Sequence, residues 1–258
     1  SYSAIDVNNN YAVNTVNHTY LPLIKKNVII KDNCRVTRII SNKTNVKGVV
    51  YLDKNKNLKK ITSRFVILAC NGIGTPRLLL ASKNKYFKKG LANSSGLVGK
   101  NLMLHPLGFA EGIFEKFMNS DFGPEGCCVY SHQFYETNKK NNFKRGCTLQ
   151  VLRGNGPLET ANYLKKLRIL KYGKDFFKIF FSNYNHTIPI AIISEDLPSK
   201  NNSIELDNEI KDAWGEPGVK INYKIHNNTK KILKFGLNKA IKVLKKAGAK
   251  KIISFAPV

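Results

Sequence analysis

Residues 66–82 read "VILACNGIGTPRLLLAS": an apolar run, a glycine-containing turn and a second apolar run. The run Val66 to Cys70 is continuously apolar, which is typical of a strand buried on both faces of a sheet. Thr75 is a favourable N-cap and Pro76 suits the first helical position, so we expect a helix to begin here. The stretch therefore predicts a strand, a tight turn and a helix N-terminus, which is where open α/β sheets bind ligands.

The segments before this stretch predict an antiparallel meander. Residues 28–41, "VIIKDNCRVTRIIS", are rich in β-branched side chains, and "VKGVVYLD" at 46–53 follows after a polar turn. A second polar turn leads into "LKKITSRFVILAC" at 58–70. Together these segments predict three or four strands joined by short polar turns.

The second half of the chain has a different pattern, and we place a domain boundary near Pro106. Helical material is predicted within 157–181, and the strand candidates are 107–117, 146–154, 187–196, 202–208 and 218–226. Trp214, in the turn-rich "DAWGEPG", is interpreted as a packing residue of a linker. The last element is a helix over 227–249 with apolar residues at helical spacing, Asn228 or Thr229 as its N-cap and Gly248 at its end. The predicted fold class is mixed, α/β and α+β, with domains 1–105 and 106–258.

The net charge of +26 has two interpretations. A nucleic-acid-binding protein would be strongly basic. A compositional bias accounts better for 36 lysines against 7 arginines, spread along the whole chain, because nucleic-acid contacts favour arginine. We therefore expect no nucleic-acid partner. A basic module that binds nucleic acid or another anion without catalysis stays as the alternative.

Motifs of metal-dependent and nucleophilic enzymes are absent from the sequence. The five cysteines form no C-x-x-C pair, so neither a metal site nor a disulfide framework is predicted, and both a cytoplasmic and a periplasmic location stay open. No G-x-G-x-x-G, Walker A, H-E-x-x-H or G-x-S-x-G sequence occurs. The longest apolar-leaning run, 179–194, is too short and too polar to cross a bilayer, so no transmembrane segment is predicted.

Several segments, in the same order, resemble the glucose-methanol-choline (GMC) flavin oxidoreductases. "CRVTRI" at 34–39 with residues 46–53 resembles the meander that follows the first FAD-binding half. Residues 66–82 resemble the second family signature, usually Gly-Ala-Ile-x-Ser/Thr-Pro, with Asn71-Gly72 in place of Gly-Ala. "GLANSSGLVGKNLMLHP" at 90–106 and "EDLPSKNNSIELD" at 195–207 resemble later family stretches. The wording "ACNGIGTPRLLL" is nearest to the sugar and sugar-acid dehydrogenase branch.

The resemblance implies a fold and an activity. The fold would be part of a Rossmann-like FAD-binding domain with a β-meander, followed by an antiparallel-sheet substrate domain. The parent enzyme would transfer a hydride from a CH–OH group of an alcohol or sugar to FAD, with a cytochrome subunit as a possible electron acceptor. The family's glycine loop would lie before Ser1 and its catalytic His beyond Val258. We therefore expect an internal fragment that holds no catalytic residue, does not bind FAD tightly and does not oxidise alcohols.

The resemblance also assigns site residues. Val36 matches the residue whose backbone meets the adenine end of FAD, and Ala69 and Asn71 lie at the strand end and turn that approach the cofactor. Asn101 and His105 belong to the family stretch near the crossing between domains. His105 ends an uncharged, turn-rich segment before a Pro, and the resemblance implies that it and Asn101 support the site without performing the chemistry.

Overall fold

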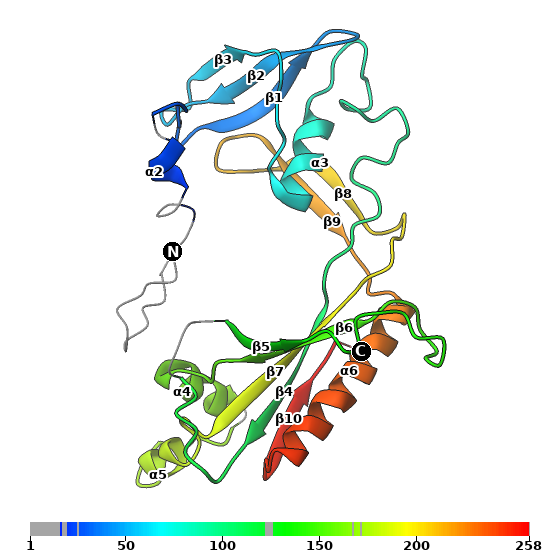
Figure 1. Cartoon of the computed structure of the whole chain (residues 1–258). Helices are drawn as coiled ribbons and strands as arrows, with labels where there is room; N and C mark the ends of the chain where they lie inside the picture. Colours follow the sequence, from blue (N-terminus) through cyan, green and yellow to red (C-terminus); the bar gives the residue numbers. More distant parts are fainter. Residues whose placement is uncertain are drawn as a thin grey trace. The chain divides into compact units, whose positions relative to one another are not determined.

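The computed structural model describes residue 16 and the ranges 20–24, 26–121, 126–166, 168–170 and 172–257. These residues form helices and three sheets in which all strand pairs are antiparallel (Figure 1). The chain divides into two compact units. The meander unit comprises Lys25–Met103 and Pro198–Lys224, and the large-sheet unit comprises Leu104–Leu197 and Ile225–Val258 together with Ser1–Ile24.

This division differs from the predicted domains 1–105 and 106–258 at Ser1–Ile24, which is assigned to the large-sheet unit, and at residues 198–224. The first change of unit follows Met103, close to the predicted boundary, but residues 198–224 return to the meander unit. They contain the hairpin of β8 (Ser203–Lys211) and β9 (Pro217–Asn222), and β8 packs against helix α3 (Asn71–Ala81). The second domain is therefore interrupted, because the hairpin packs on a helix far away in the sequence.

The predicted meander is confirmed. Strands β1 (Arg35–Ser41), β2 (Val46–Leu52) and β3 (Leu58–Thr62) pair in the order β1-β2-β3. Asp53 Oδ1 shapes the β2–β3 turn by accepting hydrogen bonds of 2.9 Å from the backbone N–H groups of Asn55 and Asn57. The small core of this unit has three buried side chains at its centre, Ile39, Leu78 and Leu91.

The strand predicted for Val66–Cys70 does not form. In the part of the chain that the structure describes, this segment pairs with no other strand. Leu68 packs against the small core, whereas Phe65 and Ile67 are 81% and 91% exposed. The prediction is wrong because a strand buried on both faces needs packing on two sides, and the described residues supply it on one.

Helix α3 begins before the predicted cap at Thr75. Asn71 adopts a left-handed backbone conformation, with φ of 61°. Its Oδ1 accepts hydrogen bonds from the backbone N–H groups of Ile73 at 2.9 Å and Gly74 at 3.0 Å. Asn71 thus satisfies two of the donors that every helix N-terminus leaves free, and the helix starts there.

The large-sheet unit is built on one antiparallel sheet of five strands in the order β10-β4-β7-β6-β5. Its strands are β4 (Leu107–Ile113), β5 (Cys127–Ser131), β6 (Cys147–Leu152), β7 (Thr187–Ser194) and β10 (Lys251–Phe255). The described helices assigned to this unit are α2 (Leu21–Ile24), α4 (Pro157–Lys166), α5 (Phe176–Phe181) and α6 (Asn227–Lys246). Among the helices described, none is long and apolar enough to span a bilayer.

Helix α6 covers one face of this sheet, as its predicted apolar spacing indicates. Its residues Ile232, Leu233, Ala240 and Leu244 are buried against β4, β6 and β7. Burial also raises the pKa of the Cys147 thiol, at the start of β6, to about 11.

The N-cap predicted for α6 is corrected. His226 occupies the cap, and its Nδ1 accepts from the backbone N–H of Asn228 at 3.0 Å. The two predicted caps are engaged elsewhere: the Asn228 amide bonds the backbone of Lys144, and Thr229 Oγ1 donates to Asp196 at 2.6 Å. These partners are distant in the sequence, so the sequence did not reveal them.

Gly236 sets the distance between α6 and the sheet, and we predict that Gly236→Ala destabilises the unit. Alanine would gain about 1 kcal/mol of helix propensity. Its Cβ would lie 2.5 Å from Ile192 Cγ2 and 2.9 Å from Cys147 Sγ, both on fully buried side chains. Such overpacking costs about 1–3 kcal/mol, so the expected net result is faster hydrogen exchange of the α6 amides.

The matched control is Asn238→Ala, an exposed position on the same helix. It gains helix propensity without a clash and should slow exchange slightly. Equal protection in the two variants would show that α6 does not approach the sheet this closely.

Candidate functional site

A cavity of about 400 Å³ lies in the meander unit. It is lined by the start of β1, by one side of α3 from its first residue to its last and by the β8–β9 loop. Its volume is within the range of small-molecule sites, about 300–1,000 Å³. Because α3 begins here, the positive end of its helix dipole and the guanidinium of Arg35 both lie at the cavity.

The structure brings together two of the three residues assigned to cofactor binding. Val36 and Asn71 line the cavity, whereas Ala69 is exposed in the preceding segment and does not line it. Val36 lies on β1, which is an outer strand of its sheet. Asn71 caps the helix that forms the opposite wall. Of the strand, turn and helix start predicted here, the structure contains the turn and the helix start but not the strand.

The two residues expected to support the site, Asn101 and His105, are not among the residues that line the cavity. Asn101 belongs to the meander unit and has a left-handed φ of 59°, beside the bridge between Lys100 and Ser203. His105 belongs to the large-sheet unit, where its Nδ1 lies 3.2 Å from the carbonyl oxygen of Ser194 at the end of β7. The environment of His105 is that of a residue that fixes backbone position.

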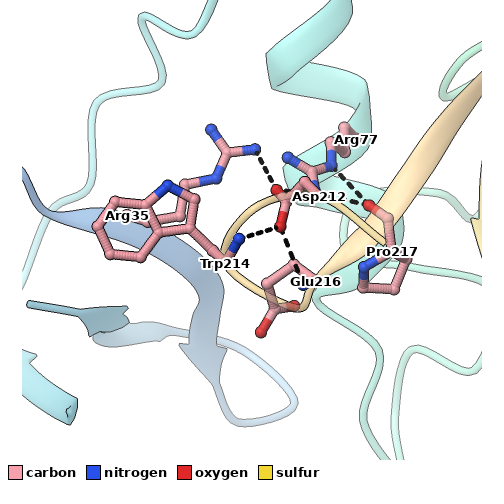
Figure 2. Close-up of polar contacts among 6 residues, drawn as sticks. All are labelled: Arg35, Arg77, Asp212, Trp214, Glu216 and Pro217. Carbon is pink, nitrogen blue, oxygen red and sulfur yellow. Dashed lines mark hydrogen bonds and ion pairs between the residues drawn. The ribbon is translucent and has the colours of Figure 1, made fainter. Parts of the chain in front are cut away.

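Asp212 organises the loop side of the cavity (Figure 2). Its Oδ2 lies 2.7 Å from Arg77 Nη2 and 3.4 Å from Arg35 Nη2. Its Oδ1 accepts from the backbone N–H groups of Trp214 at 2.9 Å and Glu216 at 3.0 Å. One carboxylate therefore ties the β8–β9 loop to β1 and to α3.

Arg77 completes this arrangement from the helix. Its Nε donates to the carbonyl oxygen of Pro217 at 3.0 Å, and its side chain is only 13% exposed. Burial alone would raise the pKa of the Asp212 carboxyl, but the hydrogen bond from Arg77, the N–H groups of Glu216 and Trp214 and the charge of Arg77 hold it below its usual value. Asp212 is therefore ionised at neutral pH.

Sequence reasoning missed this cluster and placed Trp214 in a linker. Two signals pointed toward it. Arginine is scarce in this chain, so Arg35 and Arg77 are unusual choices at their positions. "DAWGEPG" begins with Asp and lies between two strand candidates, which is typical of a hairpin loop held by an Asp side chain.

A second surface of interest is the face of the five-stranded sheet opposite α6. Gly108, Ala110 and Gly112 of β4 face the α6 side. By strand alternation Leu107 and Phe109 point to the other face, where they are 41% and 37% exposed. The register adds further residues to this face, namely Phe255, Gln150 and Tyr130.

We predict that Asp212→Asn loosens the cavity wall. The neutral amide leaves Arg77 without its counter-ion, which should cost about 2 kcal/mol of local stability at neutral pH. Because the folded pKa is lowered, the stabilisation is present above the unfolded Asp pKa of about 3.9 and is lost as pH falls through the folded value. The free energy of unfolding of the wild-type chain should therefore fall as the pH is lowered. The Asp212→Asn variant should be less stable at neutral pH and should show a smaller fall in acid.

Urea unfolding followed by the fluorescence of Trp214, the single tryptophan, measures this effect at the loop itself. Glu209→Gln, an exposed carboxylate of the same hairpin, is the charge-matched control. If the free energy of unfolding depends on pH in the same way in the wild type and in Asp212→Asn, the stabilising role assigned to the Asp212–Arg77 pair would be contradicted.

Among the residues that the structure describes, no group of three or more His, Cys, Asp and Glu side chains could hold a metal ion.

Residues 3–107 match the family model described as GMC oxidoreductase. The chain is 32% identical to 2-methyl-1,2-propanediol dehydrogenase of Mycolicibacterium austroafricanum over 241 residues, which are 92% of this chain and 44% of the relative. It is 26% identical to the fructose dehydrogenase large subunit of Gluconobacter japonicus over 217 residues, which are 81% of this chain and 38% of the relative. The chain thus spans less than half the length of either relative. Residues 3–107 therefore match the GMC oxidoreductase family, and over most of its length the chain is similar to an alcohol and a sugar dehydrogenase.

Proposed function

We propose that this chain is part of an FAD-dependent dehydrogenase that oxidises a CH–OH group of an alcohol or sugar. The observation that carries the proposal is the cavity in the meander unit, which is lined by the two residues assigned to the cofactor, Val36 and Asn71, both within the family-matched residues 3–107. In this proposal the meander unit contributes to a Rossmann-like FAD-binding domain, and the large-sheet unit contributes to the substrate side. The names of both relatives, a diol and a sugar dehydrogenase, support the substrate class.

The residues of the cavity fit the adenosine part of FAD. The outer edge of β1 offers backbone groups to a planar ring beside Val36. The start of α3 provides positive potential, which suits the phosphates that follow the adenosine, whereas the charge of Arg35 is already paired with Asp212. Gly74 has no side chain, so the wall of the cavity is open at the first turn of α3.

Bound FAD would supply the hydride acceptor for the oxidation. The protein's own contribution is to bind and orient the cofactor and the alcohol. The Asp212–Arg77 pair holds the loop that closes one side of the cavity. On the large sheet, Phe109 and Leu107 would exclude water from an alcohol carbon, and the Gln150 amide would hydrogen-bond a hydroxyl group. We assign no catalytic role to His105, since its Nδ1 lies 3.2 Å from the carbonyl oxygen of Ser194.

A partner subunit is part of the proposal. The second relative is called a large subunit, which supports an electron-acceptor subunit, for example a cytochrome, in the complete enzyme.

We predict weak FAD binding by the chain of 258 residues, and we predict that Gly74→Leu lowers the affinity about tenfold. Leucine would occupy the cavity, as Gly74 lines it. Gly72→Leu is the matched control, because it lies in the same turn of α3, does not line the cavity and would find open space within 4 Å of its Cβ. Titration followed by flavin fluorescence, with ADP as competitor, measures both.

Equal FAD affinities of the two variants would contradict the placement of FAD in this cavity. Retention of stoichiometric flavin by the purified chain would overturn the expectation that it binds weakly.

We also predict that Phe109→Ala lowers kcat/KM for the alcohol about tenfold in the active enzyme, because the substrate carbon loses an apolar contact. Lys242→Ala, on the exposed side of α6, should have no effect. Steady-state oxidation with an artificial electron acceptor gives both values, and an unchanged kcat/KM for Phe109→Ala would exclude this face from the substrate site.

A further inference from the structure

Helix α5 exposes an unusual amount of aromatic surface. Its six residues read "FFKIFF", and Phe177 and Phe181 are 68% and 59% exposed. Tyr172, just before the helix, is 84% exposed. We call Tyr172, Phe177 and Phe181, with the exposed Lys174 and Lys178, the α5 patch. Figure 1 shows α5 at the margin of its unit, beyond α4 and away from α6.

The α5 patch is held in place by an inner row of rings. Phe176, Phe180 and Tyr184 form this row, with successive ring centroids 6.4 and 5.4 Å apart, and the exposed Tyr172 stacks on Phe176 at 6.0 Å. The row ends in a hydrogen bond of 2.6 Å from Tyr184 Oη to Asp121 Oδ2. A helix of six residues is not stable alone, so this row and its anchor fix α5 with its second row, Phe177 and Phe181, turned outward.

The charge around the α5 patch is strongly positive. Lys174 and Lys178 lie on the same turns as the exposed rings. The sequence of residues 165–184 contains one acidic residue, Asp175, and six basic residues, Lys165, Lys166, Arg168, Lys171, Lys174 and Lys178. Aromatic rings between lysines match the boundary of an anionic bilayer, where rings lie among headgroups and ammonium groups reach phosphates.

Two other classes of partner fit this chemistry less well. Lysine is depleted at the centre of protein–protein interfaces, and here two lysines lie among the exposed rings. Single-stranded nucleic acid needs free ring faces for its bases. In α5 each of the two outer rings offers at most one free face, since Phe177 and Phe181 stack on each other at 6.3 Å with an interplanar angle of 18°.

We propose that the α5 patch docks the protein peripherally on an anionic lipid bilayer, with Phe177 and Phe181 at the level of the headgroups and Lys174 and Lys178 on lipid phosphates. This role is independent of the cavity in the meander unit.

Flotation of the full chain with vesicles tests the proposal, using phosphatidylcholine alone and phosphatidylcholine mixed with phosphatidylserine. The chain should float with the mixed vesicles and much less with the neutral ones. The double variant Phe177→Ser/Phe181→Ser should lose about tenfold or more in partitioning. Phe65→Ser, an 81% exposed ring of the meander unit, should retain wild-type binding.

Two double charge-reversal variants distinguish the effect of the lysines in the α5 patch from the effect of the net charge of the chain. Lys174→Glu/Lys178→Glu should abolish the preference for anionic vesicles. Lys234→Glu/Lys242→Glu, on the exposed side of α6, changes the net charge equally and should reduce binding far less. Equal losses in the two pairs, or equal flotation of the Phe65→Ser and Phe177→Ser/Phe181→Ser variants, would overturn the proposal. So would vesicle binding that survives in the double Phe variant while its binding to single-stranded poly-dT is lost, which would assign the patch to nucleic acid.

Discussion

The meander unit depends on a single carboxylate. Asp212 uses one oxygen for the guanidinium groups of Arg77 and Arg35 and the other for two backbone N–H groups of its own loop. Removing the carboxylate would leave the largely buried guanidinium of Arg77 without its counter-ion, which is costly in a protein interior. The loop, the start of β1 and the first turns of α3 are therefore held together, and the cavity exists because they are.

The large-sheet unit obeys a different constraint, the alternation of side chains along an antiparallel strand. On β4, glycine and alanine face α6, so the helix can approach closely. The intervening positions carry Leu107 and Phe109 to the opposite face. The close fit of α6 on one side thus determines which residues are available to a substrate on the other. The packing and the proposed substrate surface are two consequences of one register.

The two proposed roles use separate parts of the molecule and different physics. Cofactor binding at the cavity relies on backbone edges and on the positive end of a helix, both of which are placed by hydrogen bonds. Membrane docking at the α5 patch relies on exposed rings and unpaired surface charge. An enzyme that passes electrons to another subunit would be served by both, since attachment to a surface concentrates the two proteins in one plane.

Much of the local structure followed from the sequence. The apolar spacing of residues 227–249 predicted α6, and the alternating branched residues with polar turns predicted β1 to β3. These features depend on neighbours one to four positions away, which a sequence displays directly. The family resemblance likewise depended on contiguous signatures at 66–82 and 90–106, and the family match bears it out. The resemblance also drew attention to Val36 and Asn71, but only the structure shows that both line one cavity.

Only the tertiary structure decided the rest. Val66–Cys70 has the composition of a buried strand, yet composition does not supply the neighbouring strands that burial requires. Thr229 and Asn228 are good caps by type, but each is taken by a partner that the fold brings from elsewhere. Asp212 and Arg77 are separated by 135 positions and meet only because a hairpin packs on a helix. Sequence determines what each segment prefers by itself, whereas long-range contacts decide which preference is satisfied, because their energies exist only once distant groups have been brought within a few ångströms.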